Sequence, residues 1–326
     1  MSEMNKLINK IIAGDCVEIL NGVSEPFADL VFADPPFNIG YKYDKYKDDR
    51  KKEHYIDWTR QWMGACCNVL KPTGSFYVAI GDDYAAQVKM IAEDELKLFC
   101  RNWIIWHYTF GQQMKNKFAR SHTHIFYFVK DKKNFTFNDF AVRAPSDRQL
   151  VYKDKRANSV GKMPDDVWSC YSRVCGTFSE RQGWHPCQMP ELLLARIIAS
   201  SSNPGNCVLD PFIGSGTTAA VAAKYGRSYC GIDISEDYAK NADKRIVEIK
   251  SQISNLKSQI FSAIELEEIK RLFVETGLSI AKLVENAKLL EIFTSQFSLR
   301  MDNNKKYDPA QIASVIKEFT GWDKRI

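Results

Sequence analysis

Short apolar runs alternate with longer stretches of helical periodicity along the first two-thirds of the chain. Apolar runs predict strands at Lys10–Ala13, Asp29–Ala33, Ser75–Ile80, Trp103–Tyr108 and Ile125–Val129. Apolar residues at helical spacing predict helices over Tyr55–Leu70 and Tyr84–Glu95. The sequence Lys71-Pro72-Thr73-Gly74 predicts a turn from the first of these helices into the next strand.

The periodicity fails between about residues 131 and 184, where the chain is polar, basic and aromatic. It returns with a helix at Pro190–Ser202, a strand at Cys207–Asp210, a helix at Thr217–Tyr225 and a strand at Ser228–Ile232. Alternating strands and helices predict an α/β fold with a doubly wound, largely parallel sheet. The irregular segment is then an insertion into that fold.

The remainder of the chain, from Glu236 onward, has helical spacing, interrupted by Gly277-Leu278-Ser279. Asp308-Pro309 predicts the start of a last short helix. This tail could pack on the sheet or on a second subunit, or it could form a DNA-binding helix–turn–helix over residues 265–292. We therefore predict a core over residues 1–235 and a helical C-terminal extension over 236–326. The core divides into a catalytic half (10–130), the insertion (131–184) and a cofactor half (185–235).

Composition narrows the class of protein. With 326 residues, of which 45% are apolar, the chain can bury a substantial core. Its nine cysteines include no CxxC pair, so we expect reduced thiols in a cytosolic protein. His122 and His124 have no second ligand pair after them, so we expect no metal site. We also find no signal-peptide core and no apolar run near the ~18 residues of a membrane helix.

Positive charge is concentrated in the middle of the chain. The net charge is +5, yet residues 115–162 hold twelve Lys and Arg against four acids. Phe135, Phe137, Phe140 and Tyr152 lie among these charges. Basic and aromatic residues together favour a nucleic-acid surface, although a solvated loop would have a similar composition.

A glycine-rich loop follows the strand that ends at Asp210. Gly214, Gly216 and Ala219 have the G-x-G-x-x-G/A spacing, and Asp233 ends the next strand. This order predicts a nucleoside site in which an acid binds the ribose hydroxyls. Thr217 stands where a phosphate-binding loop would have lysine, and the strand ends carry acids. This negative charge would attract the sulfonium and ammonium of S-adenosylmethionine and repel the phosphates of a dinucleotide, so it favours S-adenosylmethionine.

The strand at Asp29–Ala33 ends in Asp34-Pro35-Pro36-Phe37. The Asp34 carboxylate and the Pro35 carbonyl are acceptors, and neither proline nitrogen carries a hydrogen. Two acceptors beside an aromatic ring suit a planar base with an exocyclic amine, as in adenine or cytosine. In a doubly wound sheet this loop and the glycine loop should open on the same edge.

DPPF at 34–37, followed much later by DPFIGSGTT at 210–218, resembles the amino-group DNA methyltransferases that use S-adenosylmethionine. The catalytic motif comes first, as in the permuted beta class of adenine-N6 and cytosine-N4 enzymes, and the resemblance covers about residues 10–235. GDCVEIL (14–20), NVLKPTGSFYV (68–78) and HPCQMPELLLARII (185–198) also match in kind and order. One departure is Met189, where the family often has lysine. Without that lysine, the cofactor carboxylate would be bound by the hydroxyls of Thr217 and Thr218 or by helix N–H groups.

The resemblance implies a Rossmann-like methyltransferase fold and methyl transfer to the N6 amine of a flipped adenine in double-stranded DNA. Asp34, Pro35, Pro36 and Phe37 would be catalytic, with Phe37 stacked on the base. Cofactor contacts are expected from Asp15, Cys16, His185, Asp210, Phe212, Gly214, Gly216, Thr217, Thr218 and Asp233. The insertion takes the place of the family's target-recognition region, and its candidate DNA contacts are Arg143, Arg148, Lys153, Lys155 and Arg156.

Three alternatives stay open at this point. They are a cytosine-N4 methyltransferase, a DNA-binding regulator with a vestigial core, and a nicotinamide-dependent dehydrogenase. Membership of a restriction-modification system would add a cognate restriction endonuclease as a partner, and a homodimer is a further expectation. We expect no membrane partner and a location in the prokaryotic cytosol or nucleoid.

Overall fold

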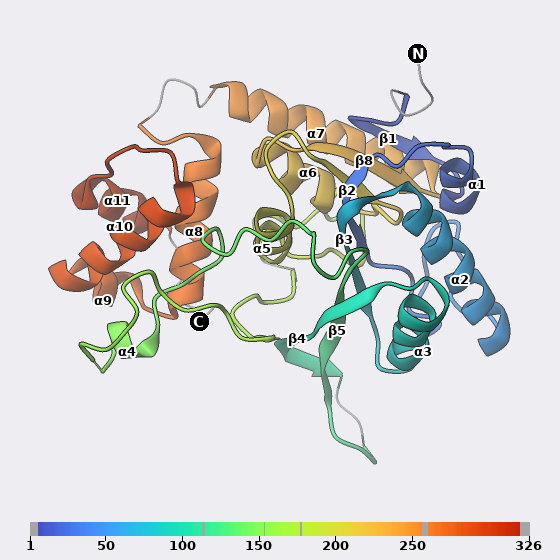
Figure 1. Cartoon of the computed structure of the whole chain (residues 1–326), viewed down its shortest axis with the longest axis horizontal. Coiled ribbons are helices and arrows are strands. Elements are labelled where there is room, and N and C mark those ends of the chain that lie inside the picture. Colours follow the sequence, from blue (N-terminus) through green and yellow to red (C-terminus); the bar gives the residue numbers. More distant parts are fainter. Residues whose placement is uncertain (1–5, 113–114, 153, 177, 256–259, 320–326) are drawn as a thin grey trace.

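The computed structural model describes residues 6–112, 115–152, 154–176, 178–255 and 260–319 (Figure 1). Within these residues the strands form one sheet, in the order β1-β8-β7-β2-β3-β5-β4-β6. Their bounds are β1 Lys10–Ala13, β2 Ala28–Ala33, β3 Leu70–Ile80, β4 Phe99–Gln112, β5 Arg120–Val129, β6 Val167–Trp168, β7 Cys207–Asp210 and β8 Ser228–Asp233.

The sheet is largely parallel, as predicted. β1, β8, β7, β2 and β3 pair in parallel, and β5 runs antiparallel to both of its neighbours, β3 and β4. The predicted strands all form, but β4 is much longer than expected, and β3 begins five residues early, at Leu70, so that the predicted turn lies within the strand. Early pairing of β3 with β2 is stabilised by Lys71, whose ammonium lies 2.9 Å from the Asp29 carboxylate.

Helices cover both faces of this sheet. One face carries α1 (Cys16–Asn21), α2 (Lys52–Val69) and α3 (Ala85–Met90), with a π-helical turn at Ile91–Glu95 where an α-helical end was predicted. The other face carries α5 (Glu191–Ser201), α6 (Thr217–Lys224) and α7 (Glu236–Asn255). In β2, Leu30 and Phe32 belong to one core, while Val31 and Ala33 belong to the other. This alternation is what a doubly wound sheet requires.

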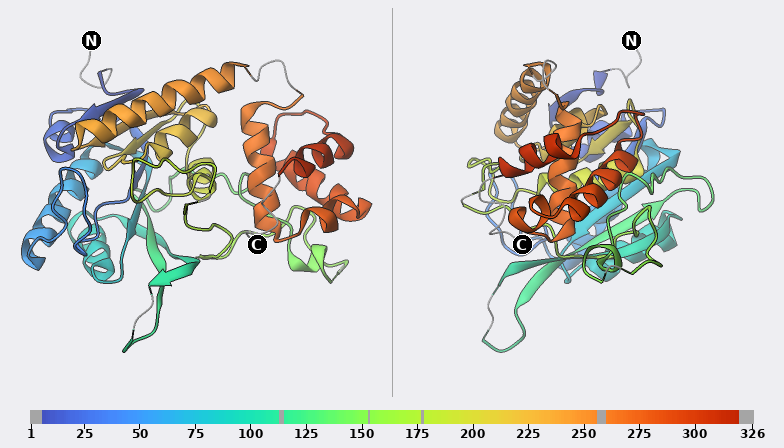
Figure 2. Two further views of the ribbon diagram at one scale, coloured as in Figure 1. Left: turned by 180° about the vertical axis from the view of Figure 1, so that it is seen from behind. Right: turned by 90° about the vertical axis from the view of Figure 1, so that its left-hand side faces the viewer.

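Beyond α7 the chain forms a second group of helices at the opposite end of the molecule from α2 (Figures 1 and 2). They are α8 (Ala263–Thr276), α9 (Ile280–Val284), α10 (Ala287–Met301) and α11 (Pro309–Lys317). Gly277 ends α8 with a left-handed φ of 63°. The helix after this turn, α9, has five residues, which is short for a recognition helix. None of the helices that the structure describes is long and apolar enough to cross a membrane.

Between β5 and α5, the described residues form little regular structure, namely α4 (Asp147–Leu150) and β6. This segment runs from the end of β5 to the C-terminal helices and back to α5 (Figure 1). On the way β6 pairs with β4, which places Trp168 beside Trp106. The indole nitrogen of Trp106 donates to the carbonyl of Tyr171 at 2.7 Å. The irregular segment is therefore attached both to the sheet and to the C-terminal helices.

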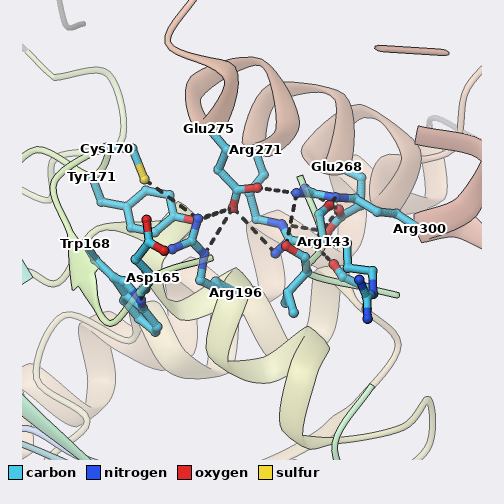
Figure 3. A network of polar contacts seen from close by, with 12 residues as sticks. Arg143, Asp165, Trp168, Cys170, Tyr171, Arg196, Glu268, Arg271, Glu275 and Arg300 are labelled. Atoms are coloured by element: carbon cyan, nitrogen blue, oxygen red, sulfur yellow. Dashed lines mark hydrogen bonds and ion pairs between the residues drawn. The ribbon is translucent and has the colours of Figure 1, made fainter. Parts of the chain in front are cut away.

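A buried network of charges makes the second attachment (Figure 3). Arg196 of α5 lies 2.9 Å from the carboxylate of Glu275 in α8, and the two side chains are 7% and 1% exposed. Glu275 also pairs with Arg300 of α10 and accepts a hydrogen bond from the Tyr171 hydroxyl. Burial opposes ionisation of Glu275, but the charges of Arg196, Arg300 and Arg271 outweigh it and hold its pKa well below the usual range.

The same arginines bind the backbone of the irregular segment. Arg271 donates to the carbonyl of Ala141 and pairs with Glu268, and Arg300 donates from Nε to the carbonyl of Arg143 at 2.9 Å. These carbonyls lie outside any helix or strand, so side chains take the place of ladder partners. The C-terminal helices thus hold the irregular segment at Ala141, Arg143 and Tyr171.

We expect Glu275→Gln to lower the free energy of unfolding by about 3–5 kcal/mol, because it leaves buried arginines without their counter-charge. Urea denaturation at pH 7.5 measures this change. Glu291→Gln is the matched control, since Glu291 is an exposed acid on α10. Equal stability of the two variants would contradict a central role for Glu275.

Candidate active site

A cavity of about 330 Å³ opens at the carboxyl ends of β2, β7 and β8, where Asp34, Asp210 and Asp233 lie. This volume is in the range of small-molecule sites. Thirteen of the fourteen residues predicted for catalysis and cofactor binding line it. They are Asp15, Cys16, Asp34, Pro35, Pro36, Phe37, His185, Asp210, Phe212, Gly214, Thr217, Thr218 and Asp233. The fourteenth, Gly216, is the N-cap of α6 with a φ of 80°, and it shapes the loop without lining the cavity.

The Asp34-Pro35-Pro36-Phe37 turn is anchored to the protein at Pro36 and Phe37, and its polar acceptors at Asp34 and Pro35 have no protein donor among the described residues. The Tyr55 hydroxyl donates to the Pro36 carbonyl at 2.6 Å. Phe37 packs against Gly81, where an added Cβ would lie 3.3 Å from the ring. Among the described residues, none donates a hydrogen bond to the Asp34 carboxylate or to the Pro35 carbonyl. Both acceptors therefore remain free for a ligand.

The glycine loop is fixed by the two acids that flank it. Asp210 accepts from the backbone N–H of Phe212 at 2.9 Å and from the Thr218 hydroxyl at 2.6 Å. Asp233 accepts from the backbone N–H of Gly214 at 2.9 Å. Gly214 has a φ of +45°, and a Cβ there would lie 2.7 Å from Nε2 of His185. Only glycine lets the backbone pass so close to the imidazole.

The hydroxyls of Thr217 and Thr218 both make hydrogen bonds to other groups of the protein. Thr217 Oγ1 lies 2.9 Å from Ser215 Oγ and accepts from Arg245 at 3.0 Å. Thr218 donates its hydrogen to Asp210. Met189 is buried at 9% exposure and supplies no charge. The cations that line the cavity come from elsewhere in the sequence, namely Lys45, Arg50, Arg120 and Arg173.

Burial changes the titration of the site. It raises the pKa of Asp34 to about 7, with a further increase from the charge of Asp210 and an opposing effect of Arg173. Burial also raises the pKa of Asp210 to about 7, against the hydrogen bonds from Thr218 and Phe212. The pKa of His185 falls to about 4 because the imidazole is buried, so this side chain is neutral at pH 7. Bringing a cation into the cavity would relieve the repulsion between the carboxylates.

Asp48 holds the loop that follows the Asp34 turn, and the sequence analysis missed it. It is 2% exposed, and its two oxygens accept from the backbone N–H groups of Asn38, Ile39 and Tyr41 at 2.7, 3.0 and 3.1 Å. Asn38 itself adopts a φ of 58°. One carboxylate thus fixes the loop that continues from the Asp34 turn. The only signal in the sequence is one acid among several in YKYDKYKDDR, so its partners could not be read in advance.

The predicted DNA-binding residues lie apart from this cavity. Arg143 is paired with Asp139 at 2.8 Å, and Arg156 with Asp154 at 3.0 Å. Arg148 and Lys155 are exposed, and Lys153 lies outside the described residues. None of the four described side chains lines the cavity. They belong to the segment around α4, beside α9 in Figure 1.

The chain matches the family model described as "DNA methylase" over residues 28–244. It is 37% identical to DNA adenine methyltransferase YhdJ of Escherichia coli (strain K12) over 270 residues, which cover 80% of this chain and 87% of that protein. It is 35% identical to Type II methyltransferase M.HpaI of Haemophilus parainfluenzae over 237 residues, or 73% of this chain and 74% of that protein.

Solved structures have the same fold at lower identity. The cytosine-N4-specific PvuII DNA methyltransferase superposes with a TM-score of 0.55 at 20% identity, covering 74% of this chain and 91% of that one. A DNA modification methylase of Thermus thermophilus, TTHA0409, complexed with S-adenosyl-L-methionine, gives a TM-score of 0.52 at 21% identity, covering 74% and 94%. The predicted Rossmann-like methyltransferase fold with its helical C-terminal region is confirmed.

We expect Asp48→Ala to lower kcat/KM about tenfold, because three backbone N–H groups lose their acceptor and the loop over the cavity loosens. Steady-state kinetics and a thermal midpoint measure both effects. Asp49→Ala is the control, since Asp49 is half exposed and pairs only with Lys47 among the described residues. Asp48→Asn keeps one acceptor oxygen and should recover part of the activity. Wild-type kinetics in Asp48→Ala would refute a positioning role.

Proposed function

The chain belongs to the DNA methylase family, and from that premise we propose that it transfers a methyl group from S-adenosylmethionine to the N6 amine of adenine at a specific sequence in duplex DNA. One observation carries the proposal. The Asp34 carboxylate has no hydrogen-bond donor among the described residues, and it faces the same cavity as the glycine loop. A half-buried carboxylate that opens into the cavity and accepts no hydrogen bond from the described residues is suited to an amine donor from outside the protein.

The cavity fits the cofactor in two respects. Four acids line it, Asp15, Asp34, Asp210 and Asp233, and this negative charge suits a cationic ligand. At Gly214 the backbone lies so close to the His185 imidazole that any side chain would clash with it, so glycine lets the loop and the imidazole line the cavity together. Asp233, Phe212, Gly214 and Cys16 would hold the nucleoside, and S-adenosylmethionine would supply a methyl group already activated by the sulfonium.

The residues of the chain would then prepare the amine. Its lone pair is delocalised into the purine ring, which makes it a poor nucleophile. The Asp34 carboxylate and the Pro35 carbonyl accept hydrogen bonds from its two N–H groups, favour the tetrahedral form of the nitrogen and stabilise the developing positive charge. Phe37 stacks on the base, and the turn held by Tyr55 fixes the line of attack. The target amine is inside the duplex before reaction, so the base must be flipped out.

Adenine is favoured over cytosine by the motif and by the relatives. Asp-Pro-Pro-Phe is typical of adenine-N6 members, and YhdJ is named a DNA adenine methyltransferase. The second candidate is cytosine-N4 methylation, for which PvuII methyltransferase provides a precedent within the fold. Mass spectrometry of nucleosides from DNA methylated by the purified protein separates N6-methyladenine from N4-methylcytosine. Genome-wide sequencing of modified bases in a methylation-free host then gives the target sequence.

We also propose roles for the two remaining parts of the chain. Residues 131–184 read the sequence, with Arg148 and Lys155 as exposed contacts, and residues 236–326 hold that segment in place through the Glu275 network. Double-stranded DNA is the partner, in the prokaryotic cytosol. A homodimer and a cognate restriction endonuclease stay predictions, and sedimentation tests the first.

We expect Asp34→Ala to lower methyl transfer by at least a thousandfold, since the variant loses the acceptor on which the chemistry depends. Binding of S-adenosylmethionine should change less than tenfold, because other residues make the nucleoside contacts. Tritium transfer to the target duplex and calorimetric titration measure the two quantities. Asp49→Ala controls for loss of a carboxylate nearby in the sequence, since Asp49 is half exposed and does not line the cavity. Full activity in Asp34→Ala would disprove the mechanism.

The affinity for S-adenosylmethionine should fall about tenfold between pH 7.5 and pH 6. Asp34 and Asp210 have pKa values of about 7 in the free protein, so they lose their charge over this interval and attract the sulfonium less. S-adenosylhomocysteine, which lacks the sulfonium charge, is the control and should show a weaker dependence. Equal pH dependence for the two ligands would contradict a role for these carboxylates.

A further inference from the structure

The β4–β5 hairpin extends well beyond the sheet (Figures 1 and 2). Strand β3 supports β5 only as far as His124, and β6 pairs with β4 only at Ile105 and Trp106. From His107 and His122 outward, the two strands have only each other as strand partners among the described residues. The hairpin end is therefore an arm with no supporting strand on either side.

The tip of this arm combines an aromatic ring with positive charge. Phe118 is 99% exposed, the highest value for any large hydrophobic residue that the structure describes, and the next is Tyr152 at 74%. Lys115 and Lys117 beside it are also exposed. The sequence from Gln112 to Arg120 contains no acid. Single exposed apolar residues are common, but a fully exposed phenyl ring between cations at the end of an arm suits an anionic partner with apolar faces.

The arm also begins at the active site. Tyr108, Arg120 and His122 line the cavity that holds Asp34. Phe118 is two residues from Arg120, so at most ~7 Å separates the Cα atom of Phe118 from that of a residue that lines the cavity. Arg120 is held in place by Asp82, at 2.8 Å. A macromolecule bound at the tip of the arm would therefore also lie close to the cavity entrance at Arg120.

We propose that this arm enters the DNA duplex beside the target and that the Phe118 ring stacks in the space left by the flipped base. Lys115 and Lys117 neutralise the flanking phosphates. The inference rests on the proposed function and adds a residue to it. Base flipping costs unpairing and unstacking, and an aromatic ring that replaces the lost stack lowers this cost.

The test compares Phe118→Ala with wild type on two duplexes that carry the target sequence. One duplex is fully paired, and in the other an abasic site stands opposite the target base, which opens the pair in advance. We expect the variant to lose about tenfold or more in kcat/KM on the paired duplex, the size of one lost base–ring stack. On the abasic duplex it should come within about threefold of wild type. 2-Aminopurine at the target position should show weaker unstacking with the variant.

Phe99→Ala is the matched control, because it makes the same change at the opposite end of the same hairpin, where Phe99 is 43% exposed. The ratio of its kcat/KM on the paired duplex to that on the abasic duplex should equal the wild-type ratio. Equal rates for Phe118→Ala and wild type on paired DNA would overturn the inference, and so would an equal loss on both duplexes. A shift in sedimentation that Phe118→Ala alone produces would assign the ring to a second copy of the chain instead, and would also overturn it. If the wild-type protein transferred no methyl group to any DNA, the proposed function itself would be wrong, and so would the inference that rests on it.

Discussion

The structure depends on the parallel pairing of β2 with β7. Leu30 pairs with Val208 and Val31 with Leu209, so both strands end at the same edge of the sheet. The Asp34 turn and the glycine loop are far apart in the sequence, yet this pairing makes them neighbours. Because β8 pairs in parallel with β7 on its other side, Asp233 joins the same edge. These registers place the cavity between the Asp34 turn and the glycine loop.

Bringing several carboxylates to one edge carries an electrostatic cost. Burial and mutual repulsion raise the pKa of Asp34 and of Asp210 to about 7. The protein uses two of these acids structurally, since Asp210 and Asp233 accept backbone N–H groups of the glycine loop. Asp34 alone keeps both oxygens free of donors among the described residues. Asp210 and Asp233 therefore maintain the shape of the cavity, whereas the free carboxylate of Asp34 is suited to contact the reacting group.

The buried arginine–glutamate network solves a different problem. A segment with almost no helix or strand must keep one conformation if it is to contact DNA in a fixed register. Arg271 and Arg300 bind its carbonyls, and Glu275 holds the arginines and Tyr171 together. A buried ion network of this kind contributes less to net stability than an apolar core of equal size would, but it is selective for one arrangement. Through Tyr171 and Trp106 this arrangement reaches the wall of the cavity.

Local information in the sequence was sufficient for the fold class, the order of the strands along the chain and the two loops of the site. Apolar periodicity marks the elements, and Asp34-Pro35-Pro36-Phe37 and Gly214-x-Gly216 carry their chemistry within a few residues. The sequence did not determine which acid holds the loop, which cations reach the cavity, how far the β4–β5 arm extends or what the C-terminal helices bind. Asp48, Arg173 and Glu275 resemble other charged residues until their partners are known, and those partners are distant in the chain. Only the tertiary structure decides such contacts, because they depend on which strands pair and in which register.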